Sequence, residues 1–113
     1  MIKGSRINAI MNSYKFVKES GGNDTKWYRL WTDGWIEQGG RLTATAFSNT
    51  VTLHKEFKNT NYTVLSQFTW TTAGDVKYPP REIIASRTTK TFVLTTAYAY
   101  ASGMGMQWYA CGF

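Results

Sequence analysis

The stretch from residue 26 to residue 40, KWYRLWTDGWIEQGG, constrains the fold of this chain more than any other. Large side chains alternate along its first half, so that Trp27, Arg29 and Trp31 share one side of an extended backbone. Alternation with a period of two residues is typical of a half-buried β-strand. We therefore predict that this stretch begins with a strand that has one face against the core.

The run is interrupted by a turn signal, Thr32-Asp33-Gly34. Aspartate bonds its own backbone and glycine adopts positive φ, so Asp-Gly between two aromatic runs predicts a tight β-hairpin. The second strand restarts at Trp35, and Gly39-Gly40 is expected to stop or bulge it. Because a buried tryptophan removes roughly 150–250 Å² from water, we expect this hairpin to form the centre of the core.

The composition fits one β-rich domain. The chain has 113 residues, of which 18% are charged, below the roughly 25% that is usual. Its net charge of +6 favours anionic partners, but the basic residues are scattered from Lys3 to Lys90, which fits a solvated surface equally well. No apolar run is long enough for a membrane span and no secretory signal is evident, so membrane insertion is not expected.

The remaining pattern predicts seven or eight short strands with turn signals every eight to twelve residues. The expected strands cover residues 14–19, 25–31, 35–42, 47–57, 62–70, 81–87, 91–97 and 106–113. No helix longer than a turn or two is predicted. Phe92 and Leu94 are expected to point inward, with the reverse, Val93 and Thr95 inward, left open. Trp108 and Ala110 are expected to share one face of the last strand. This pattern indicates an all-β fold, a small antiparallel β-sandwich or barrel.

The hairpin also resembles a known sequence block. WYRLWTDGWIEQGG is similar to the block that opens the C-terminal domain of many phage and prophage tail fibres. Agreement continues in VTLHKEFKNTNYTV (51–64), TTKTFVLTT (88–96) and WYACGF (108–113), so the resemblance covers about residues 14–113. This chain has Trp31-Thr32 where the family commonly has Tyr-Ser, a conservative change in the hairpin.

The resemblance implies an H-type lectin-like β-sandwich that assembles as a homotrimer at the tip of a virion tail fibre. Residues 1–13 would then be a lead-in from the upstream fibre shaft and residues 14–113 the tip domain. The implied function is host recognition, by noncovalent binding of lipopolysaccharide, capsule or an outer-membrane protein. Such a protein would be made in the host cytoplasm.

Catalytic and metal chemistry has little support in the sequence. His54 is the only histidine and Cys111 the only cysteine, so we predict no metal, no cofactor and no intrachain disulfide within one chain. Three copies of His54 meeting on a trimer axis remain an open alternative. Glu37 shares a strand face with Trp35, as in a sugar-cleaving site, but a carboxylate that supports the hairpin explains it better. We therefore expect no enzymatic activity.

Carbohydrate binding suits the residues better, because sugar sites pair aromatic plates with amide, carboxylate and guanidinium groups. Two loops supply this mixture, and the candidate ligand-binding residues are Trp70, Asp75, Lys77, Tyr78, Arg81, Tyr98, Tyr100 and Gln107. For Tyr98 and Tyr100, a contact between subunits fits equally well. We assign a structural role to Trp27, Trp31, Asp33, Gly34, Trp35 and Trp108, with the tryptophans in the core.

Three other uses of the domain stay open. It could trimerise and cap the fibre without a ligand of its own, or it could degrade a glycan as a depolymerase. Nucleic-acid binding would also use basic charge and aromatic side chains, but no basic stripe or RNA-recognition signature is present, so no nucleic-acid partner is expected.

Overall fold

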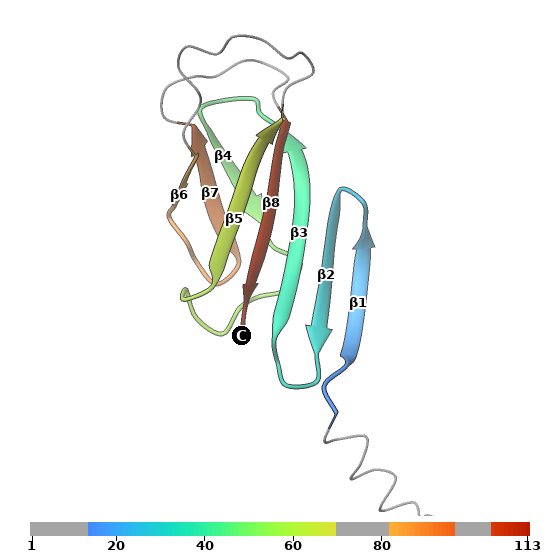
Figure 1. Cartoon of the computed structure of the whole chain (residues 1–113). Coiled ribbons are helices and arrows are strands. Elements are labelled where there is room, and N and C mark those ends of the chain that lie inside the picture. The colour runs from blue at the N-terminus through green and yellow to red at the C-terminus, as the bar shows by residue number, and fades with distance from the viewer. Residues whose placement is uncertain (1–13, 70–81, 97–104) are drawn as a thin grey trace, which may run out of the picture.

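The computed structural model describes residues 14–69, 82–96 and 105–113, which form eight strands in two antiparallel sheets (Figure 1). The strands are β1 (Val17–Asn23), β2 (Lys26–Trp31), β3 (Ile36–Thr43), β4 (Ser48–Thr52), β5 (Thr63–Thr69), β6 (Glu82–Ala85), β7 (Thr91–Thr96) and β8 (Gly105–Gly112). The described residues contain no helix, and therefore none that could span a membrane. The prediction of a small antiparallel β-sandwich is confirmed.

The larger sheet has the strand order β1-β2-β3-β8-β5, and the smaller sheet has the order β4-β7-β6. In Figure 1, β4 passes behind β5 and β8, β7 and β6 lie to the left of β5, and β1 and β2 stand on the other side of β3. The predicted meander of the first three strands is confirmed, since β1 pairs with β2 and β2 with β3. β8 inserts between β3 and β5 and pairs with both, so the C-terminal strand joins the meander to the rest of the sandwich.

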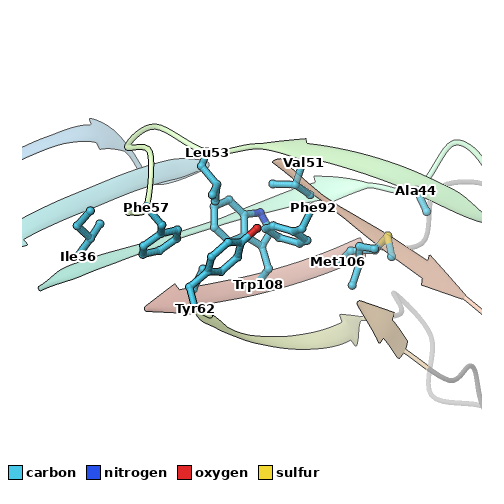
Figure 2. Close-up of a cluster of buried hydrophobic side chains, with 11 residues drawn as sticks. Ile36, Ala44, Val51, Leu53, Phe57, Tyr62, Phe92, Met106 and Trp108 are labelled. Atoms are coloured by element: carbon cyan, nitrogen blue, oxygen red, sulfur yellow. The ribbon is translucent and has the colours of Figure 1, made fainter. Parts of the chain in front are cut away.

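The core lies between the two sheets, where apolar side chains of β4 and β7 meet those of β3 and β8 (Figure 2). Phe92 and Leu94 are completely buried, as expected. Trp108 and Ala110 share one face of β8, as the alternation predicted, and that face is buried. The Phe92 ring meets the Trp108 indole edge-on at 5.3 Å between centroids. These contacts hold the two sheets together through apolar burial.

The hairpin tryptophans are not part of this core, and that prediction is wrong. Trp27, Trp31 and Trp35 are only half-buried, and Trp108 alone of the four predicted core tryptophans is buried. The reason is architectural. Trp27 and Trp31 project from the side of the five-stranded sheet that points away from the second sheet, where none of the described strands covers them, so their side chains remain partly accessible (Figure 1).

The Asp33-Gly34 turn is confirmed. The Trp35 backbone N–H donates to Asp33 Oδ1 at 2.9 Å, and Gly34 has a φ of 90°, in the left-handed region that favours glycine. Trp31 N also donates to Trp35 O at 2.8 Å, which closes the hairpin. Sequence-local chemistry therefore fixes the turn between β2 and β3.

The first strand lies further along the chain than predicted. It covers Val17–Asn23 rather than 14–19, so Ser20-Gly21-Gly22 belongs to a strand and not to a turn. Gly21 pairs with Tyr28, and an added Cβ would lie 2.7 Å from the tyrosine ring, so glycine is required there by cross-strand packing. The turn instead forms at Asn23, whose Oδ1 accepts from the N–H groups of Thr25 and Lys26.

The predicted break at Gly39-Gly40 is also wrong, because β3 runs through both glycines in regular register. A Cβ at Gly39 would lie 2.8 Å from the Trp27 ring, and one at Gly40 would lie 3.1 Å from the Trp108 ring. The two glycines therefore make room for one indole on each face of the sheet.

The predicted strand 47–57 ends early, since β4 covers only Ser48–Thr52. Beyond it, the chain is held by the fully buried side chain of Gln38. Gln38 Oε1 accepts from the N–H groups of His54 (3.0 Å) and Lys55 (3.2 Å), and Nε2 donates to Lys55 O (2.9 Å). One amide thus satisfies three backbone groups that would otherwise pair in a strand ladder.

Candidate ligand-binding face

Only one predicted ligand-binding residue lies in the part of the chain that the structure describes. Gln107 is on β8, and its side chain is exposed. The other seven predicted residues fall outside the described residues: Trp70, Asp75, Lys77, Tyr78, Arg81, Tyr98 and Tyr100. The candidate site is therefore built outward from Gln107.

Gln107 belongs to the side of the five-stranded sheet that points away from the core, here called the outer face. Its members alternate with the buried residues of each strand and are Trp27, Arg29, Trp31, Glu37, Arg41, Leu65, Gln67, Gln107, Tyr109 and Cys111. The strand register places Gln67 opposite Gln107 and Leu65 opposite Tyr109. The face thus combines aromatic, amide and charged side chains on a rigid sheet.

Glu37 organises the half of the outer face nearest the hairpin turn. Its Oε1 accepts a hydrogen bond from Trp31 Nε1 at 2.5 Å, and its Oε2 accepts one from the Tyr109 hydroxyl at 2.7 Å. Burial, and then the bond to Glu37, raise the pKa of Tyr109 well above its usual range, so this hydroxyl remains a donor. The carboxylate therefore fixes aromatic side chains on β2 and β8, as expected for a group that supports the hairpin.

Cys111 lies beside this group and is half-buried. Burial raises the pKa of its thiol, and the Glu37 carboxylate raises it further. A thiol with a raised pKa is a poor nucleophile, which fits the predicted inert role. His54 is likewise engaged, since its ring lies 5.4 Å from that of Tyr28 and its Nε2 is 3.2 Å from Lys26 O. No cluster of metal-ligating side chains occurs among residues 14–69, 82–96 and 105–113.

The other half of the outer face carries two adjoining hollows. One of about 240 Å³ is lined by Asp24, Trp27, Gly40, Arg41, Gln107 and Trp108. The second, of about 260 Å³, is lined by Leu65, Ser66, Gln67, Gln107, Trp108 and Tyr109. Both are lined by Gln107, which therefore lies at their junction. Their lining residues come from β2, β3, β8, β5 and the turn before β2, so the two hollows run across the sheet.

Aromatic and charged side chains of this region are held in place by one another. Arg41 Nη2 lies 2.6 Å from Asp24 Oδ2, and the Arg29 guanidinium stacks over the Trp27 ring at 5.2 Å. The Trp27 and Tyr109 rings lie 6.2 Å apart. The sequence placed Trp27 on one face of its strand together with Arg29 and Trp31, but we predicted that this face lies in the core. Asp24, Arg41 and Gln67 were not predicted as ligand-binding residues.

A third hollow lies at the opposite end of the sandwich, beside the hairpin turn. Its volume is about 610 Å³, and it is lined by Asp33, Gly34, Glu56, Phe57, Lys58 and Phe113. Next to it, Lys15 Nζ lies 3.0 Å from Asp33 Oδ2 and 5.5 Å from the Trp31 ring centroid. This cluster ties the segment before β1 to the hairpin turn, which is a structural role.

Comparison with known proteins identifies the fold. No protein-family model and no curated protein matches the chain. Among solved structures, an R2-type pyocin tail fibre matches with a TM-score of 0.64 at 16% identity, over 100% of this chain and 44% of its own. The R2 pyocin fibre of P. aeruginosa matches with a TM-score of 0.62 at 17% identity, over 100% of this chain and 30% of its own.

An R1-type pyocin tail fibre also matches, with a TM-score of 0.62 at 12% identity, over 100% of this chain and 98% of its own. The chain therefore spans less than half the length of the two R2 fibre chains and nearly all of this R1 chain. At these identities the agreement establishes the fold. The resemblance to phage tail fibres is confirmed at that level, and the chain has the fold of pyocin tail fibres.

Proposed function

We propose that this domain is the receptor-binding tip of a phage-type tail fibre and recognises a bacterial surface glycan or outer-membrane protein. The observation that carries the proposal is the agreement of the whole chain with solved tail fibres. A tail fibre attaches a particle to a cell, so a domain with this fold is suited to host recognition in the virion.

The chemistry of the outer face supports noncovalent binding. Gln67 and Gln107 are paired across β5 and β8, and both line one hollow together with Tyr109. The best-placed carboxylate, Glu37, already accepts hydrogen bonds from two aromatic side chains. We therefore propose that the domain binds its receptor without cleaving it.

Assembly as a homotrimer is part of the proposal. An apolar side chain remains accessible on the smaller sheet, where Ile83 on β6 is 47% exposed. A domain this small gains stability when it buries such surface between subunits. Three tips on each fibre, and several fibres on each particle, would convert a modest affinity at each site into firm attachment.

The test is to label the purified domain with a fluorophore, apply it to a panel of bacterial strains, and measure its mass in solution in the same preparation. A trimeric mass with labelling of some strains and not others supports a receptor-binding tip. A trimeric mass without labelling of any strain would instead favour a capping role. A monomer that labels no strain would contradict both roles.

A further inference from the structure

We propose that the two hollows around Gln107 form one groove that binds a short, electrically neutral oligosaccharide across the five-stranded sheet. This inference rests on the proposed function, because it names the surface and the ligand chemistry through which the tip recognises its host. The groove is defined by Asp24, Trp27, Arg41, Leu65, Gln67, Gln107 and Tyr109, together with the backbone between them.

The shape of the groove fits a chain molecule. Single ligand pockets commonly measure roughly 300–1,000 Å³, and each hollow, at about 240 and 260 Å³, is smaller than that. Because Gln107 lines both, a ligand that fills the two in succession reaches that range. The groove crosses β2, β3, β8 and β5, and neighbouring strands lie about 4.8 Å apart, so its length is about 14 Å.

The lining has the two kinds of surface that a sugar presents. Sugar hydroxyls both donate and accept hydrogen bonds, and each glutamine amide offers a donor and an acceptor in a fixed geometry. Gln67 and Gln107 are directly opposed in the strand register and line the same hollow. Trp27 and Tyr109 supply apolar ring surface for the hydrophobic faces of the sugar rings.

The charge of the lining indicates a neutral ligand. The charged side chains that line the two hollows are Asp24 and Arg41, and they form an ion pair at 2.6 Å. Their charges cancel, although the chain as a whole carries a net charge of +6. The pair still presents carboxylate acceptors and guanidinium donors to hydroxyl groups, since 79% of the Asp24 side chain and 52% of the Arg41 side chain are exposed.

The test compares site variants with matched controls. Gln107→Ala removes the shared amide, and Thr50→Ala makes a similar truncation of an exposed polar side chain on β4, in the other sheet. Arg41→Ala is matched by Lys90→Ala, which also removes one basic group from an exposed ion pair. Each variant is titrated onto a strain that the unaltered domain labels, and its mass in solution is measured.

We expect Gln107→Ala and Arg41→Ala each to weaken cell binding about tenfold or more, as the loss of hydrogen-bonding partners predicts, and both controls to bind normally. Polysaccharide released from the same strain by mild acid hydrolysis of its lipopolysaccharide, or its purified capsule, should compete. Affinity should change less than about threefold between 50 and 500 mM NaCl, because a neutral ligand forms no ion pair to be screened.

Several results would overturn the inference. If the domain labels cells and both site variants bind normally, the groove is wrong but the proposed function stands. If the variants lose their trimeric mass, the surface is a subunit contact. Failure of both polysaccharides to compete, or a tenfold or greater loss of affinity at high salt, would exclude a neutral saccharide. If the domain labels no strain, the proposed function fails and this inference fails with it.

Discussion

Replacement of Gln38 by leucine should destabilise the domain strongly, although the two side chains have similar volumes. The Gln38 side chain is completely buried and bonds the N–H groups of His54 and Lys55 and the carbonyl of Lys55. Leucine fills the space but leaves all three backbone groups without their partner. Each unsatisfied buried group costs about 1–3 kcal/mol, and these groups lie near the surface, so we expect a total loss of about 3 kcal/mol.

The assay is urea denaturation followed by tryptophan fluorescence, at one fixed protein concentration because assembly contributes to apparent stability. Gln67→Leu is the matched control. It makes the same substitution in the same sheet, at an exposed residue, and should change the free energy of unfolding by less than about 0.5 kcal/mol. A loss below about 1 kcal/mol for Gln38→Leu would refute the role assigned to this amide.

Gln38→Glu adds a pH test of the same contacts. Burial raises the pKa of a carboxyl above its unfolded value, and the protonated form can still donate to Lys55 O. A raised folded-state pKa contributes stability that is present below the unfolded pKa and is lost as pH rises through the folded pKa. The deficit of this variant relative to the unaltered domain should therefore shrink between pH 7 and pH 4.5. A deficit that is constant over this range would contradict the argument.

Three further perturbations follow from the fold. Gly39→Ala should cost about 1–3 kcal/mol in urea denaturation, because its Cβ would lie 2.8 Å from the Trp27 ring, and no loss would show that the indole can move. Tyr62→Phe should cost about 1–2 kcal/mol in thermal denaturation, since the hydrogen of its hydroxyl is shared between the backbone carbonyls of Thr88 and Thr91, and an unchanged melting temperature would contradict this. The Trp35 N–H, and then Lys15, lower the pKa of Asp33, so the stability that this carboxylate contributes is present above its unfolded pKa. The difference between Asp33→Ala and the unaltered domain should accordingly fall as pH is lowered below the unfolded pKa of Asp33, and a difference that does not change with pH would contradict the argument.

Features of the fold that depend on residues close together in the sequence could be predicted from it. The Asp33-Gly34 turn was predictable because the aspartate bonds the backbone two residues later, within the hairpin itself. The placement of Phe92 and Leu94 on one shared face was predictable because strand alternation fixes it once the strand is recognised. The resemblance to tail fibres correctly predicted the fold.

Features that depend on distant residues could not be predicted. Gly39 and Gly40 resemble a strand break in sequence, but both lie within β3, where the absence of a side chain leaves space for the rings of Trp27 from β2 and Trp108 from β8. The end of β4 is set by Gln38, which lies on another strand. Trp27 and Trp31 are partly exposed because they project from the face of the larger sheet opposite to the second sheet, and strand alternation alone does not tell which of the two faces is covered.

The candidate site also combines a residue that the sequence could identify with residues that only the fold brings together. Gln107 was selected from composition, and the structure places it at the junction of two hollows. Its partners come from turns and strands that are far apart in sequence, such as Asp24 beside β1 and Gln67 on β5. Only the pairing of β8 with both β3 and β5 brings these residues to one surface.

Saturation binding to intact cells tests host recognition most directly. The fluorescent domain is titrated onto one strain that it labels, with and without a large excess of unlabelled domain. A specific receptor predicts a saturable curve that the unlabelled domain abolishes, because the number of sites on a cell is finite. Labelling that rises without saturation and resists competition would show adsorption through the net charge of +6, and it would contradict a receptor-binding tip.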